Sequence, residues 1–174
     1  MPDLYSNSND GRILSSNTAS WADARDDTSG FNTNTSLSSA QSFTEVLRAS
    51  GRAGINYRVG RSFMYFDTSG ITGNVSTATI KIYGYTGNDG SIIAVKSTAF
   101  GGDGGTTLAN GDIDAIVGWA TGASAAGNVT DYSNSITTSS WNTSAYNSLT
   151  GTSDLKNDMK NNDVVIICFM DYTN

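Results

Sequence analysis

The stretch Arg61–Asp67 (RSFMYFD) constrains the fold most strongly, because a run of large apolar residues ends abruptly at turn-forming residues. In a strand, alternate side chains point to opposite faces, so Met64 and Phe66 share one face while Phe63 and Tyr65 share the other. The Asp-Thr-Ser-Gly sequence that ends the run favours a turn, since its side chains can bond nearby amides. The pattern predicts a strand that is covered on both faces, or one that is lined by loops and partners.

The same periodicity predicts further strands. Residues 76–85 form the clearest half-buried strand, because Ala78, Ile80 and Ile82 face one way while polar and tyrosine residues face the other. The apolar run VVIICFM, residues 164–170, predicts a central strand covered on both faces. We also expect strands at 43–49, where a helix is the alternative, at 91–100, 113–120 and 136–141, and a short strand with a long loop over 21–42.

One segment has helical spacing. Thr152 or Ser153 could cap a helical turn in which Leu155 and Met159, four residues apart, face the core.

Composition agrees with a chain of strands and turns. Ser, Thr, Gly and Asn are abundant, proline occurs once in 174 residues, and only 15% of residues are charged. This disfavours helices and favours strands joined by many turns. We therefore predict an all-β fold, an antiparallel β-sandwich with long polar loops and at most one or two short helical turns. Residues 1–20 are expected to form an N-terminal arm or linker, and residues 21–174 the sandwich domain.

The charge balance limits the partners. A net charge of −6 and a pI near 4.3 oppose general affinity for nucleic acid or anionic membranes, which both reward a basic face. The sequence contains neither a secretory signal pattern nor an apolar stretch of the roughly 20 residues that cross a membrane. The composition is typical of extracellular or surface-exposed proteins, but no export signal is visible. This combination favours a virion protein, which is made in the cytoplasm and released by lysis.

Residues that commonly carry catalysis are scarce. Glu45 is the only glutamate, histidine is absent, and Cys168 is the single cysteine. Because Cys168 lies within an apolar run, we expect it to be a small buried hydrophobe, and one cysteine builds neither a disulfide nor a cysteine metal site within the chain. We predict no enzymatic activity and no cofactor.

The segment Arg61–Ile71 and the following strand Ser76–Tyr83 resemble DNRLRE-type jelly-roll domains, which are similar to carbohydrate-binding modules and recur in phage virion proteins. The family has an arginine, an alternating apolar strand, Phe-Asp and a small-residue turn, and then alternating aliphatics after an alanine. A weaker likeness covers Leu155–Tyr172, and Tyr57–Ser62 replaces the signature hexapeptide. The resemblance implies a jelly-roll sandwich. Since family members continue with one further strand, it also implies a domain without its closing C-terminal strand.

Tyr83 and Tyr85, with Tyr65 nearby, are the candidate aromatic platform on a sheet face. Such rings suit stacking on sugars, and tyrosine is equally enriched at subunit interfaces. Both alternatives stay open.

Four of the ten basic residues fall within a short span, at Arg48, Arg52, Arg58 and Arg61. Guanidinium groups could bind an acidic glycan or an acidic neighbouring subunit, because they match carboxylates two bonds at a time. The alternative is that they are solvated loop charges, with Arg61 paired to an internal acid. Arg58 and Arg61 are the ligand or interface candidates of this set.

Three aspartates are candidates for a structural calcium site. Asp112 and Asp114 are two residues apart and are expected to project to the same side of a strand, and Asp103 lies in the preceding glycine-rich loop. Carboxylate oxygens are ligands that Ca²⁺ prefers. Two carboxylates could also serve a glycosidase, but the single glutamate and absent histidine disfavour hydrolysis.

The sequence thus favours a phage virion structural protein, a fibre, head appendage or decoration component, which assembles with copies of itself or other virion proteins. It could also attach to host-surface polysaccharide. The alternative is a non-catalytic carbohydrate-binding module of a cell-surface or biofilm protein.

Overall fold

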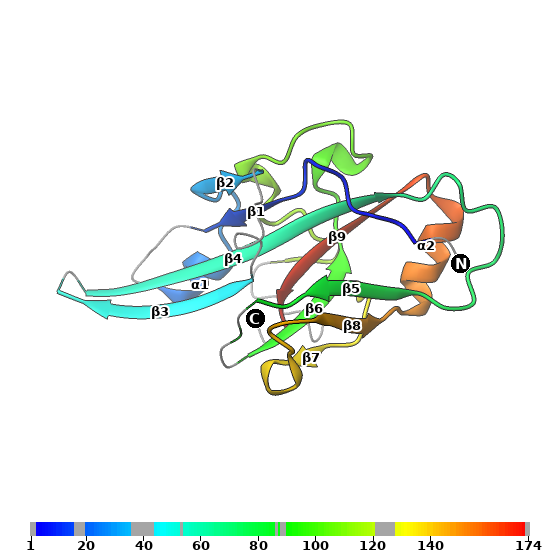
Figure 1. Ribbon diagram of the computed structural model, residues 1–174. Helices are drawn as coiled ribbons and strands as arrows, with labels where there is room; N and C mark the ends of the chain where they lie inside the picture. Colours follow the sequence, from blue (N-terminus) through cyan, green and yellow to red (C-terminus); the bar gives the residue numbers. More distant parts are fainter. Residues whose placement is uncertain are drawn as a thin grey trace.

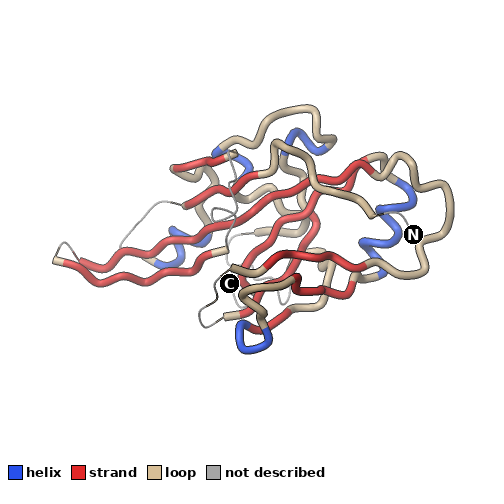
Figure 2. The backbone as a smooth tube through the Cα atoms, in the orientation of Figure 1, coloured by secondary structure: helices blue, strands red, loops and turns tan. Residues whose placement is uncertain are grey.

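The computed structural model describes residues 3–15, 20–35, 44–52, 54–85, 87, 90–120 and 128–172. Its architecture is all-β, with two antiparallel sheets that pack face to face (Figures 1 and 2). The large sheet has the strand order β2-β1-β4-β9-β6-β7, with β3 also paired to β4, and the small sheet consists of β5 and β8. The strands are β1 (Gly11–Leu14), β2 (Asn32–Asn34), β3 (Glu45–Gly51), β4 (Gly54–Asp67), β5 (Thr79–Tyr83), β6 (Ser91–Lys96), β7 (Ile136–Thr137), β8 (Tyr146–Thr150) and β9 (Val164–Asp171).

Two central strands are covered on both faces, as predicted. In β4, Phe63 and Tyr65 belong to one apolar cluster, while Met64 and Phe66 pack against the other. β9 pairs with β4 and β6 and likewise sends alternate residues to the two clusters. Cys168 of β9 is fully buried, as expected, and its burial raises the pKa of the thiol to about 12.

The two faces of the large sheet are covered differently. β5, β8 and the helix α2 (Ser153–Asn161) cover one face, where Ile80, Leu149 and Leu155 contact the sheet's side chains. Loops of residues 97–119 cover the other face and contribute Phe100, Ile113 and other buried side chains. The antiparallel sandwich is therefore confirmed, whereas its jelly-roll topology stays a prediction.

The turn after β4 forms as its residues predict. Asp67 Oδ1 accepts hydrogen bonds from the Ser69 amide at 2.9 Å and from the Ser69 hydroxyl at 2.6 Å. These bonds to the ionised carboxylate lower the pKa of Asp67. The strand ends here because the Asp67 side chain, and not a partner strand, accepts the Ser69 amide.

Several expected elements differ. Residues 113–120 were expected to form a strand, but after the 3₁₀ turn η2 (Asn110–Asp112) they form turns, with one bridge from Ile116 to Ser97. The expected strand at 136–141 is only β7 and the 3₁₀ turn η3 (Thr138–Ser140). A third 3₁₀ turn, η1, spans Phe100–Gly102. Ile113 and Ile116 are nevertheless buried against the large sheet. The apolar residues of this segment therefore reach the core from a loop and not from a strand.

Two helices occur in the described residues. α1 (Trp21–Arg25) replaces the expected strand, because the Ser20 hydroxyl accepts the Asp23 amide and caps a first turn. α2 is confirmed, with Thr152 as the N-cap, Leu155 buried and Met159 packed on the core. Of the segment 43–49, residues 45–49 lie in β3 and not in a helix, while Phe43 lies outside the described residues.

Part of the expected N-terminal arm joins the large sheet. β1 pairs with β4 and β2, and Asp10, just before it, is 6% exposed and accepts the Tyr65 amide at 3.2 Å. Burial raises the pKa of Asp10 to about 6, although hydrogen bonds from Ser6 and Tyr65 oppose the shift.

This carboxyl should make the protein more stable at mildly acidic pH. Between pH 3.8 and about 6 the folded chain holds a proton on Asp10 that the unfolded chain has released, so stability falls as pH rises. We expect Asp10→Asn, which keeps an acceptor for Tyr65, to remove about 1–3 kcal/mol of this dependence. Urea unfolding of both proteins from pH 4 to pH 7 measures it, and parallel curves would contradict the assignment.

Candidate functional site

The outer face of the small sheet displays a tyrosine cluster. Tyr83 of β5 is paired with Tyr146 of β8, and these side chains are 57% and 67% exposed. Their ring centroids are 5.3 Å apart with an angle of 88° between planes. Tyr85, two residues after Tyr83, is 71% exposed. We call Tyr83, Tyr85 and Tyr146 the tyrosine face.

Strand alternation places this face outward. Ile80 and Leu149 are buried against the large sheet, so the intervening residues of both strands point to solvent. Lys81 and Ser148 are an exposed pair beside the tyrosines. The small sheet is thus apolar on one side and polar with aromatic rings on the other.

A hydrogen-bonded turn holds Tyr146 in place. The buried Asn147 side chain accepts the Asn142 amide at 2.7 Å and donates to the Asn142 carbonyl at 2.8 Å. The Gly84 amide donates to Ala145 O at 3.0 Å. The Tyr83 hydroxyl donates to Ser144 O at 2.8 Å. The rings therefore sit on a turn that both strands fix.

Sequence analysis found Tyr83 and Tyr85 but missed Tyr146. The strand Tyr146–Thr150 alternates, yet one of its two inward positions is Asn147, which hides the apolar pattern. The asparagine is tolerated inside because the turn satisfies its amide. Register with β5 then places Tyr146 beside Tyr83.

Tyr65 does not join this cluster. Its ring packs against Phe100, with centroids 5.2 Å apart, in the apolar cluster on the other face of the large sheet. The expectation that Tyr65 lies near Tyr83 and Tyr85 is therefore wrong, because the large sheet stands between them.

The four arginines between residues 48 and 61 lie in different environments. Arg58 forms a salt bridge with Glu45 across β3 and β4, while Arg48 and Arg52 are exposed. Arg61 is fully buried. The four arginines therefore do not form one basic site.

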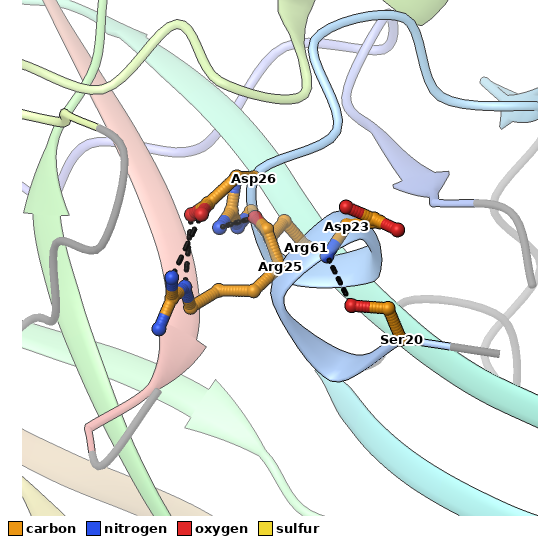
Figure 3. A network of polar contacts seen from close by, with 5 residues as sticks. All are labelled: Ser20, Asp23, Arg25, Asp26 and Arg61. Carbon is orange, nitrogen blue, oxygen red and sulfur yellow. Dashed lines mark hydrogen bonds and ion pairs between the residues drawn. The ribbon is translucent and has the colours of Figure 1, made fainter. Parts of the chain in front are cut away.

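Arg61 links three segments of the chain. Its guanidinium donates to Ile113 O at 2.6 Å and to Arg25 O at 3.2 Å, and its central carbon lies 4.2 Å from the Trp119 ring centroid. Figure 3 shows Arg61 beneath α1, where Arg25 itself bonds Asp26. Burial lowers the pKa of Arg61. The expected partner was an acid, but the hydrogen bonds of Arg61 go to main-chain carbonyls.

The calcium candidates lie in separate loop contacts. Asp103 accepts the Gly105 amide at 2.8 Å, and Asp112 accepts the Ala109 amide at 3.0 Å. Burial raises the pKa of Asp114, and the charge of nearby Arg61 opposes this. In the part of the chain that the structure describes, no group of three or more acidic, histidine or cysteine side chains is placed to hold a metal ion.

A polar network that sequence analysis missed ties α2 to β6. Asp158 of α2 accepts the Tyr132 hydroxyl and pairs with Lys96 Nζ at 2.7 Å. Burial would raise the pKa of Asp158, but the bonds from Lys96 and Tyr132 lower it overall. No local pattern marks these residues, because they come from β6, α2 and the segment at Tyr132, which are far apart in the sequence.

None of the helices in the described ranges has the length and apolar character needed to cross a membrane.

Comparisons with known proteins do not identify a family for this chain. No family model, curated protein or solved structure matches it. The resemblance to DNRLRE-type domains therefore stays a prediction.

Proposed function

We propose that this chain is a non-catalytic structural protein of a phage virion, a fibre, head appendage or decoration component that works through contacts with other subunits. The observation that carries the proposal is the tyrosine face, where Tyr83 and Tyr146 on the small sheet, and Tyr85 just after β5, are more than half exposed. Tyrosine is enriched at protein interfaces, because its ring buries apolar area while its hydroxyl stays hydrated. The expected location is the virion.

The second candidate is a non-catalytic carbohydrate-binding module that uses the same face. Exposed rings on a sheet favour it, since sugars stack on aromatic faces. Against it, the Tyr83 and Tyr146 planes stand 88° apart, and the Tyr83 hydroxyl already donates to Ser144 O. Two perpendicular rings do not offer one flat surface to a sugar chain, so the geometry supports a protein contact better.

Replacing both Tyr83 and Tyr146 with alanine should lower the mass of the assembly that the purified protein forms. The rings are exposed, so the free energy of unfolding should fall by less than about 1.5 kcal/mol, the value of one edge-to-face pair. Light scattering coupled to sizing chromatography measures mass, and urea unfolding measures stability. Tyr5→Ala, at an exposed tyrosine outside the small sheet, is the matched control and should leave the mass unchanged.

The same proteins distinguish the two functions. A wild-type monomer whose migration shifts in a gel containing polysaccharide, and loses that shift in the double variant, would overturn the structural proposal in favour of the binding module. A wild-type oligomer that keeps its mass without the two tyrosines would exclude the tyrosine face as the contact.

A further inference from the structure

A long two-stranded hairpin projects from the body of the molecule. It comprises β3 and the first half of β4, which are paired from Glu45–Gly60 to Gly51–Gly54, and it extends beyond the other strands in Figures 1 and 2. Val46 and Ile55 on it are 47% and 40% exposed. Among the described residues, β3 pairs with β4 alone.

The hydrogen-bond pattern shows which main-chain groups on the hairpin face outward. Val59 of β4 exchanges bonds with Ser15, on the side of β1. In antiparallel pairs the direction alternates with each residue. Residues of β3 opposite odd-numbered positions of β4, namely Val46, Arg48 and Ser50, therefore point their N–H and C=O groups away from β4. This edge is a template for another strand.

Charge identifies the partner. Within 45–60, three arginines and one glutamate give a net charge of +2, so the remaining chain, out of −6, carries −8. Arg58 is paired with Glu45, but Arg48 and Arg52 are exposed near the tip. A second copy of this acidic chain is thus an electrostatically complementary partner for the hairpin.

Charge also selects the geometry. If two β3 edges paired antiparallel about their centre, Arg48 would lie opposite its own counterpart, and like charges opposite each other are destabilising. A contact with a different surface of the next copy, whose chain outside the hairpin has a net negative charge, avoids this repulsion. Among the strands that the structure describes, the order of the large sheet ends at β2 and β7, and a strand can add at such an end.

We propose that the β3–β4 hairpin adds its outer edge to a sheet edge of a second copy, in a head-to-tail contact that forms rings or filaments. A non-twofold contact of this kind leaves a free hairpin at one end of a filament and a free receiving edge at the other end, and it leaves neither free in a closed ring. This inference rests on the proposed assembly function but assigns it a surface other than the tyrosine face.

The test is proline at Ser50 in the full chain. The Ser50 amide faces outward, so proline should be tolerated at this edge position while removing a donor that a neighbouring strand needs. We expect Ser50→Pro to weaken self-association by about tenfold or more, seen as lost mass in sizing with light scattering and in sedimentation velocity. Ser50→Ala, which keeps the amide, is the matched control and should associate as wild type does.

A second pair of variants tests charge without altering the backbone. Arg48→Glu should also weaken association, whereas Lys160→Glu, an equal reversal at an exposed position on α2, should not. Should Ser50→Pro unfold, which circular dichroism would show, this pair still decides the proposal. If the wild type is an oligomer and both Ser50→Pro and Arg48→Glu keep its mass, the proposed hairpin contact is wrong, while the proposed assembly function stands. A monomeric wild type that shifts in polysaccharide gels overturns the assembly function as well.

Discussion

Replacing Arg61 with alanine should destabilise the protein by about 3–5 kcal/mol, the combined cost of unsatisfied buried carbonyls and a cavity. The guanidinium is fully buried, and it joins β4 to α1 through Arg25 O and to the covering loop through Ile113 O. Its removal leaves two carbonyls without donors and a cavity beside Trp119. Urea unfolding followed by circular dichroism and tryptophan fluorescence measures the loss.

Two further variants separate the causes. Arg61→Met fills much of the volume but donates no hydrogen bond, so we expect an intermediate loss. Arg48→Ala removes an exposed arginine and should change the free energy of unfolding by less than about 0.5 kcal/mol. If Arg61→Met were as stable as wild type, packing would account for the role of Arg61 and the hydrogen bonds would not.

Replacing Gly84 with alanine should cost about 3 kcal/mol and disorganise the tyrosine face. A Cβ here would overlap the Asn142 carbonyl oxygen and lie 2.7 Å from Asn147 Nδ2 and 2.8 Å from Trp141 Nε1. The Asn142 carbonyl belongs to the turn that positions Tyr146. Relief of the overlap therefore moves β8 away from β5, and the contact between Tyr83 and Tyr146 is lost with it.

Thermal and urea unfolding measure the stability loss, and near-ultraviolet circular dichroism measures the change in tyrosine environment. Gly70→Ala is the matched control, because a Cβ at Gly70 meets nothing within 4 Å, so it should be neutral or stabilising by up to about 1 kcal/mol. Equal stability of the two variants would show that the turn is not held as described.

Central strands are predictable from this sequence because their environment is simple. The cores of β4 and β9 alternate between two apolar faces, so period two alone gives their location and their burial. β5 is equally clear, since one face is polar. A strand is hard to recognise in the sequence where a polar residue points inward, as Asn147 does in β8. The group that satisfies the Asn147 side chain lies in a turn outside the strand.

The candidate site is only partly predictable for the same reason. Alternation places Tyr83 on an exposed face. The local sequence does not predict that Tyr146 is its neighbour or that Tyr65 lies on the other side of the large sheet. Arg61 likewise suggests an internal partner, yet its acceptors come from residues 36 and 52 positions away.

By itself, then, the sequence determined that this chain is built of antiparallel strands with two doubly covered strands at the centre, because side-chain periodicity is a local property. The pairing of strands settled the rest: which tyrosines share a surface, which arginine is buried, and how the β3–β4 hairpin projects. These depend on contacts between residues distant in the chain, and register and burial arise only when those segments meet.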